Sequence, residues 1–283
     1  MSQLHPEGSR RPISPGPVPH HQVGEPGSPM LRSMKDLEGY TVSASDGDIG
    51  RVGNFLLDDK RWTVRYLVVA TGGLWDGRQV LISPISFRRA EWAGQRFHLA
   101  LTKDKIRHSP SIDTDKPVSR QHERDYYRYY RYPYYWGYAG IWGAGSYPGM
   151  LVDGDWTESR DPEPEQATRD SHLRSVKEVR GYHIQGRDGG IGHVEDFIVD
   201  DATWQIRYLV INTSNWGLGK KVLVSPDWID RVSWAQRKVF VDLSRQGIRT
   251  SPEWNSDAGV NREYEVRLYD YHGRPAYWAG RNP

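Results

Sequence analysis

The sequence predicts a mainly β protein: two tandem small six-stranded β-barrels, each followed by a short helical, aromatic-rich tail. The first observation behind this prediction is an internal repeat without gaps. Residues 33–136 align with residues 175–278 at a constant offset of 142 (175 − 33), with roughly 40 of about 104 positions identical. A period this long suits one small domain per copy better than a solenoid unit.

The second observation is that turn residues divide copy 1 (residues 33–136) into six short runs with strand-like composition. Asp46-Gly47 suits a tight hairpin turn, and Pro84 ends a strand because proline cannot donate to a sheet ladder. Six strands on one small domain favour a closed barrel, which leaves no exposed sheet edges. The expected strands are 40–44, 49–58, 62–71, 79–83, 87–92 and 96–101, followed by one helical turn at 103–108.

Local sequence signals also predict the helices of the two tails and the core residues of the two copies. Ser119 and Asn261 are good N-cap residues, so they predict helices over 120–130 and 262–271. The residues expected to point inward are the same in both copies: Phe55, Tyr66, Val68 and Val80, with Phe197, Tyr208, Val210 and Val222.

The chain therefore divides into four parts. Residues 1–32 are rich in proline and glycine without the apolar stretch of a secretory signal, which predicts a disordered leader. Residues 33–136 and 175–278 are the two copies with their aromatic tails. Residues 137–174 mix glycine, proline and acidic residues, which is typical of a linker between domains.

Composition limits the function. Thirty-eight basic and 36 acidic residues give a formal charge of +2, which lacks the strong basic footprint of a dedicated nucleic-acid binder. The absence of cysteine excludes disulfides and thiolate metal sites, and indicates a cytoplasmic protein. No apolar run is long enough for a membrane-spanning helix, so we expect no transmembrane segment.

Each copy resembles the PRC-barrel family, the small β-barrel found in the photosynthetic reaction-centre H subunit and in the C-terminal domain of the ribosome-maturation factor RimM. The resemblance covers about half of the chain and implies a barrel with a docking role and no active site. Copy 2 (residues 175–278) repeats each motif. The motifs of copy 1 are Leu37-Glu38-Gly39-Tyr40, Asp46-Gly47, Ile49-Gly50-Arg51-Val52, Phe55-Leu56-Leu57-Asp58, Arg65-Tyr66-Leu67-Val68-Val69 and Val80-Leu81-Ile82-Ser83-Pro84.

Several chemistry-bearing residues have two interpretations. Asp46, Asp48, Asp58 and Asp59 suit turns better than a cation site, since Asp48 becomes Gly190 in copy 2 and no closing Glu follows. The histidines outside the leader do not recur between the copies, so neither a metal nor any other cofactor is predicted. Arg65 and Arg207 lie inside apolar strands, where an ion pair with Asp58 or Asp200 is expected rather than a ligand contact.

The aromatic tails are the candidate interaction residues. Tyrosine and tryptophan offer large contact areas, and the interleaved arginines can stack on them or pair with anions. Packing against the barrels, which would join the copies, or against a protein partner is favoured; stacking on RNA is the alternative. The candidates are Tyr127, Tyr129, Tyr135, Trp136, Tyr269, Tyr271, Tyr277 and Trp278.

These observations favour a non-enzymatic binding or adaptor protein that docks onto a larger protein assembly. The H-subunit resemblance extends the expectation to a reaction centre or another electron-transfer complex. The alternative is an RNA- or ribosome-associated maturation factor. A protein partner is expected and nucleic acid is less favoured, while a homo-oligomer is a further possibility. Neither a nucleophile elbow nor a phosphate-binding loop occurs, so an enzyme is not predicted.

Overall fold

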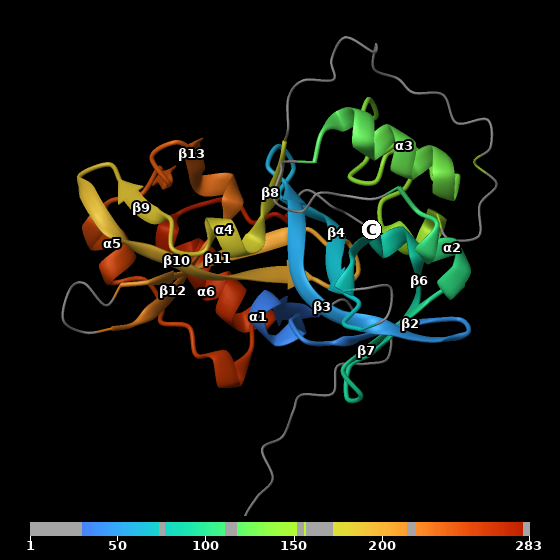
Figure 1. Cartoon of the computed structure of the whole chain (residues 1–283). Coiled ribbons are helices and arrows are strands. Elements are labelled where there is room, and N and C mark those ends of the chain that lie inside the picture. Colours follow the sequence, from blue (N-terminus) through green and yellow to red (C-terminus); the bar gives the residue numbers. More distant parts are fainter. Residues whose placement is uncertain are drawn as a thin grey trace, which may run out of the picture.

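The computed structural model describes residues 30–73, 77–110, 118–151, 156, 172–213 and 219–279. These residues form two seven-stranded sheets, one for each copy, that lie side by side (Figure 1). The mainly β class predicted from the sequence is confirmed. None of the helices in the described part is long and apolar enough to cross a bilayer.

The six strands expected in each copy are present, with hydrogen-bonded orders β5-β4-β3-β2-β7-β6 and β12-β11-β10-β9-β14-β13. Copy 1 contains β2 (Thr41–Ala44), β3 (Gly47–Asp58), β4 (Thr63–Ala70), β5 (Gln79–Ile82), β6 (Phe87–Glu91), β7 (Arg96–Leu99) and α2 (Lys103–Arg107). Copy 2 contains β9 (His183–Gly186), β10 (Gly189–Asp200), β11 (Ile206–Asn212), β12 (Lys221–Val224), β13 (Ile229–Ser233), β14 (Lys238–Val241) and α5 (Arg245–Arg249).

The predicted inward-facing residues are all buried. Those of copy 1 are Phe55, Tyr66, Val68 and Val80, and those of copy 2 are Phe197, Tyr208, Val210 and Val222. The bend of the long strands requires a glycine at one repeated position. A Cβ on Gly50 would lie 2.1 Å from the Ala70 carbonyl oxygen, and a Cβ on Gly192 would lie 2.1 Å from that of Asn212. No other residue type fits where two backbones approach so closely.

The expected closure into barrels is not confirmed. Among the described residues no ladder joins β5 to β6, or β12 to β13, so both sheets stay open at this point. The short 3-10 turns η2 (Pro84–Ser86) and η6 (Pro226–Trp228) connect the two edge strands. The prolines predicted to end β5 and β12 lack an N–H, and the turns carry the chain out of the sheet before the next strand begins.

Each copy instead receives a strand from the other. Strand β1 (Leu31–Ser33) precedes copy 1 but pairs with β10 of copy 2, and β8 (Leu173–Ser175) precedes copy 2 but pairs with β3 of copy 1. Most of the expected leader, residues 1–29, lies outside the described residues, and β1 begins inside its last part. The strands β1 and β8 have the same sequence, Leu-Arg-Ser, at the repeat offset of 142.

Ion pairs and hydrogen bonds secure the exchanged strands at matching positions. Arg32 pairs with Asp201 at 2.7 Å and Arg174 pairs with Asp59 at 2.8 Å. The hydroxyl of Ser33 donates to Asp196 at 2.6 Å. The second aspartate of each Asp-Asp pair, Asp59 or Asp201, therefore binds the arginine of the exchanged strand. This contact gives the second aspartate a structural role in both copies.

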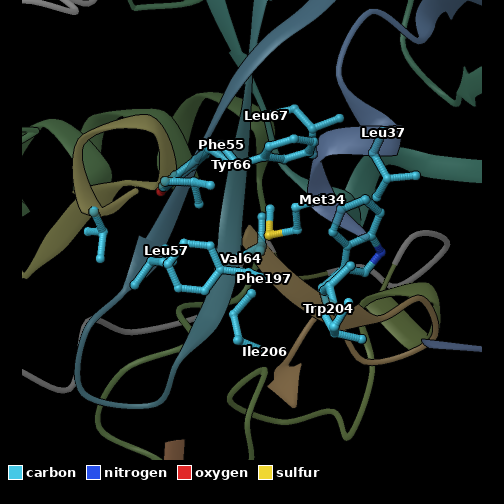
Figure 2. Close-up of a cluster of buried hydrophobic side chains, with 14 of the residues drawn as sticks. Met34, Leu37, Phe55, Leu57, Val64, Tyr66, Leu67, Phe197, Trp204 and Ile206 are labelled. Atoms are coloured by element: carbon cyan, nitrogen blue, oxygen red, sulfur yellow. The ribbon is translucent and has the colours of Figure 1, made fainter. Parts of the chain in front are cut away.

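The two copies also share a hydrophobic core. The short helices α1 (Met34–Leu37) and α4 (Val176–Val179) follow the exchanged strands, and Met34 is fully buried between the copies. Figure 2 shows Met34 and Leu37 among side chains of both copies, including Phe55, Phe197 and Trp204. The Trp204 ring lies 5.3 Å from that of Phe87 in copy 1. The copies therefore form one packed unit.

Candidate functional site: the covered and the open tyrosine networks

The predicted tail helices are present as α3 (Arg120–Tyr130) and α6 (Arg262–His272), with Ser119 and Asn261 as their N-caps. Helix α3 packs against the end of β5, at the place where β5 does not pair with β6. The Tyr126 hydroxyl accepts the Ser83 N–H at 3.0 Å and can donate to the Leu81 carbonyl at 3.3 Å. The tail thus satisfies backbone groups at the end of β5, where the sheet does not close.

Beneath α3 lies a buried network centred on Glu123. The hydroxyls of Tyr66 and Tyr135 donate to its Oε1 at 3.0 and 2.6 Å, and Arg120 donates to its Oε2 at 2.9 Å. His172, from the segment that leads into β8, lies 3.3 Å from Oε2. The carboxyl group is therefore surrounded by side chains from β4, α3, the tail and the segment that leads into β8.

Burial has a clear electrostatic effect on this network. Desolvation raises the pKa of Glu123 to about 7, although Arg120 and the two tyrosine hydroxyls oppose the change. Desolvation and the nearby Glu123 raise the pKa of Tyr66 and of Tyr135 well above the ordinary value, so both hydroxyls stay protonated donors. The network thus stabilises the buried carboxyl group of Glu123, which belongs to the fold itself.

Arg65 adds a second charge beside this network, as predicted. Its guanidinium pairs with Asp58 at 3.0 Å and lies 3.8 Å above the centre of the Tyr135 ring. Desolvation is the largest single effect on the pKa of Asp58 and raises it, but the attraction and hydrogen bond of Arg65, together with His172 and the Lys60 N–H, lower this pKa overall. The turn role expected for Asp58 is also seen, since it accepts the Lys60 N–H at 2.9 Å.

Copy 2 repeats the tyrosine, arginine and glutamate contacts of this network. The hydroxyls of Tyr208 and Tyr277 donate to Oε1 of Glu265 at 2.7 and 2.9 Å, and Arg262 lies 3.0 Å from Oε2. The predicted pair between Arg207 and Asp200 is formed at 2.8 Å. Every one of these residues lies 142 positions after its counterpart in copy 1.

A covering segment, residues 137–151, distinguishes copy 1. Its Trp142 ring is fully buried 4.9 Å from the Arg65 guanidinium, and the indole N–H donates to the Thr203 carbonyl of copy 2 at 2.7 Å. The Ile141 carbonyl accepts from Arg65 at 2.7 Å. The segment ends in the 3-10 turn η3 (Pro148–Leu151), which packs against η2.

Two further contacts fix the covering segment in place. Arg61 donates from its guanidinium to the carbonyls of Tyr138 and Gly140. Gly143 has a φ of +71°, and a Cβ there would lie 2.3 Å from the Tyr134 carbonyl oxygen. The segment therefore packs closely on the tail, within the range expected to be a linker.

Copy 2 has a pocket of about 250 Å³ beside its network. Arg207, Ser225, Pro226 and Tyr277 of copy 2 form one side, and residues of copy 1 such as Arg61 and Ile141 form the other. Arg262 is 56% exposed in its side chain, whereas Arg120 of copy 1 is 5% exposed. The open network therefore borders a cavity at the boundary between the copies.

The structure gathers six of the eight candidate residues into two clusters, one on the sheet of each copy. Tyr127, Tyr135 and Trp136 are buried together, with the Tyr127 ring 5.4 Å from the Trp136 ring. Tyr269, Tyr277 and Trp278 form the matching cluster, with Tyr269 and Trp278 5.1 Å apart. Each cluster lies on its own sheet, and the exchanged strands supply ladders that join the copies, so a role of these rings in joining the copies stays a prediction.

The last two candidates lie further out. The Tyr129 hydroxyl donates to the Lys105 carbonyl at 2.7 Å, and Tyr271 is 44% exposed. Both point away from the glutamate networks because they follow Tyr127 and Tyr269 by two positions, which places them on another side of the helix.

Sequence reasoning missed Glu123, Glu265, Arg120 and Arg262. A signal was available: each of the four is identical to its counterpart in the other copy, whereas neighbouring tail positions such as Arg128 and Asp270 differ. The glutamates also stand three positions after their arginines, the spacing of neighbours on one helix face. The missed strand β1 had a similar signal, since Leu31-Arg32 extends the repeat before residue 33.

The expected resemblance is confirmed for one part of the chain. Residues 173–246 match the family model of the PRC-barrel domain. The matched stretch begins at β8, includes all the strands of copy 2 and ends within α5. No curated protein matches the chain.

Proposed function

We propose that both copies are PRC-barrel-like domains, and that the chain is a non-enzymatic adaptor that docks onto a larger protein assembly. The proposal rests on one observation: the glutamate networks of the two copies match, but they are covered to different extents. Copy 1 is sealed by residues 137–151, while copy 2 borders a pocket at the boundary between the copies. A rigid unit with one sealed and one open network has a face suited to a protein partner.

The internal use of the repeated charges supports a binding role over catalysis. A general acid or base must reach the proton of a substrate. Glu123 is fully buried and already contacts two hydroxyls and a guanidinium, and Arg65 is fully buried against Asp58. These groups stabilise the fold, and their chemistry is used within it.

The burial of the copy 1 tail favours protein over RNA. Bases stack on aromatic rings whose faces are open to solvent. The tyrosines of the tail that could have formed such a platform are buried under one another: Tyr126, Tyr127, Tyr130, Tyr132, Tyr134 and Tyr135. A protein assembly is therefore the favoured partner, and the experiment below distinguishes it from RNA.

The test is capture of the complex from cells that express the full-length chain, after gentle chemical cross-linking. The expected result is a defined protein assembly that can be rebuilt from purified components and that survives nuclease treatment and 0.5 M salt, at about the same yield. Loss of the complex upon nuclease treatment, with a steep dependence on salt, would instead support the RNA-associated factor.

A further inference from the structure

The pocket of about 250 Å³ in copy 2 corresponds to the place that Trp142 fills in copy 1. Four residues of copy 2 that line it are the repeat counterparts, at the offset of 142, of residues under or beside the covering segment in copy 1. The pairs are Arg207 with Arg65, Ser225 with Ser83, Pro226 with Pro84, and Tyr277 with Tyr135. The match also holds across the boundary, because Arg61 is the counterpart of Thr203, which binds the Trp142 indole.

Copy 1 shows how such a place is filled. The Trp142 ring lies near the Arg65 guanidinium, its N–H donates to the carbonyl of residue 203, and the preceding carbonyl, of Ile141, accepts from Arg65. These are two hydrogen bonds and one cation–π contact from two adjacent residues. Gly143 lets the backbone approach the tail at the Tyr134 carbonyl, and Gly140 lets the covering segment fold closely onto its own Gly143 carbonyl.

Copy 2 retains the groups that make these contacts. The Arg207 guanidinium lies 4.2 Å from the centre of the Tyr277 ring, much as Arg65 lies over Tyr135. Its Nη1 donates to the side-chain oxygen of Gln205 at 2.6 Å, where Arg65 donates to the Ile141 carbonyl. The Gln205 amide thus supplies the acceptor that a peptide carbonyl supplies in copy 1.

We infer that this pocket binds a tryptophan side chain from a peptide segment of the partner protein. The inference rests on the proposed adaptor function. The cavity has room for an indole, since a cavity of about 150 Å³ holds benzene. The internal Trp142 segment is the template for the occupant: a tryptophan followed by a glycine, in which the carbonyl of the preceding residue replaces Gln205 as the acceptor for Arg207.

The experiment uses the full-length chain and a synthetic peptide with the sequence of residues 138–147, in which the tryptophan is 5-fluorotryptophan. Fluorine NMR then detects the peptide separately from the protein. The expected result is saturable one-to-one binding with a Kd on the order of 0.1 mM, weak because a short free peptide loses conformational freedom upon binding. A peptide with alanine in place of the tryptophan, followed by calorimetry, should bind at least tenfold more weakly.

A filled pocket provides the matched control. Gln205→Trp places an indole in the cavity and should abolish peptide binding. Gln246→Trp, at an exposed position of α5, should leave peptide binding unchanged. Equal binding to both variants, or equal affinity for the tryptophan and alanine peptides, would overturn the inference. A dimer of the chain that Gln205→Trp dissociates, seen by sedimentation, would overturn it in favour of a second copy.

A cross-linking measurement keeps the inference testable if Gln205→Trp fails to fold. A diazirine group at the tryptophan position of the peptide should label fragments that contain Pro226 or Tyr277 of the unmodified protein. Labelling confined to other fragments contradicts the proposed pocket. Failure of the peptide with a protein complex still captured from cells would refute this pocket alone, while absence of any protein complex would refute the adaptor function.

Discussion

The two copies differ most where their sequences stop matching. Both place a glutamate beneath two tyrosine hydroxyls and an arginine, with a second arginine bound to an aspartate at the end of a long strand. Among the described residues, a segment that follows the repeat seals this network in copy 1, with Trp142 at its centre. Residues identical in both copies thus maintain the fold, and the covering segment makes one copy different from the other.

The comparison also assigns separate roles to the tails and the exchanged strands. Each tail closes the open side of its own sheet, whereas β1 and β8 cross to the other copy. Strand exchange gives each sheet a seventh strand and places the core residues of both copies in contact. We therefore expect the described unit to unfold in one cooperative transition.

The largest expected effect comes from removing the aromatic cluster of copy 1. The double substitution Tyr135→Ala and Trp136→Ala deletes two buried rings and one hydroxyl donor to Glu123, at a cost of about 5 kcal/mol or more. Since many domains have only about 5–15 kcal/mol of stability, the protein should be largely unfolded, as measured by circular dichroism and urea titration.

The same double substitution in copy 2 is the control. Tyr277 and Trp278 are only half-buried, so replacing both with alanine should cost roughly half as much in the free energy of unfolding. Equal losses in the two variants would mean that the covering segment contributes little to the difference between the copies.

The second prediction converts copy 1 into an open copy. Trp142→Ala removes a fully buried indole and should cost about 3–4 kcal/mol, leaving a folded protein with a cavity over Arg65. That cavity is the counterpart of the copy 2 pocket, so the tryptophan peptide described above should bind at two sites per chain instead of one. Calorimetry gives the stoichiometry.

The control for this variant is Tyr147→Ala, which changes a half-exposed ring in the same segment. It should shift the free energy of unfolding by about 0.5 kcal/mol at most and leave one peptide site. Two sites in the control, or one site in Trp142→Ala, would show that Trp142 does not occupy a counterpart of the pocket.

Much of the fold could be predicted from the sequence because local signals agreed with one another. The Asp-Gly turns, the proline stops and the N-caps at Ser119 and Asn261 placed the strands and the tail helices within a few residues. The ion pair of Arg65 with Asp58 followed from a charge inside an apolar strand opposite an acidic turn. Each of these features depends on residues close in sequence.

Contacts between distant residues were harder to predict. Leu31-Arg32-Ser33 reads as an ordinary strand start, and nothing local says that its partner lies in the other copy. Closure into a barrel was expected because it would leave no exposed sheet edges, but strand spacing alone does not show whether β5 and β6 pair across Pro84. The glutamate network was missed because the composition of a polar helix does not show which of its faces is buried, and only a comparison of the two tails marks Glu123 and Glu265.

The third prediction tests the electrostatic side of the sealed network. The pKa of Glu123 is raised to about 7 in the folded protein, from 4.5. A raised pKa contributes stability that is fully present below the unfolded value and is lost as pH rises through the folded value. Stability should therefore fall between pH 5 and pH 8, by about 2–3 kcal/mol for this group alone.

Glu123→Gln keeps the shape and removes the titration. The difference in the free energy of unfolding between the original chain and this variant, measured by urea titration at several pH values, isolates the contribution of Glu123 from other groups. The original chain should lose stability relative to Glu123→Gln across this range. A constant difference would mean that the carboxyl group does not titrate in it.

The smallest expected effect compares the two arginines that reach the glutamates. Arg262→Ala should change the free energy of unfolding by about 0.5 kcal/mol or less, because its side chain is mostly exposed and solvent screens its attraction to the buried Glu265 carboxylate. Arg120→Ala should cost about 1.5–3 kcal/mol, because it removes a charged hydrogen bond from a group that water cannot reach. Thermal and urea unfolding of both variants measure the difference. If the two substitutions had equal effects, the covering of copy 1 would not isolate its network from solvent, and the contrast between a sealed and an open copy would lose its energetic basis.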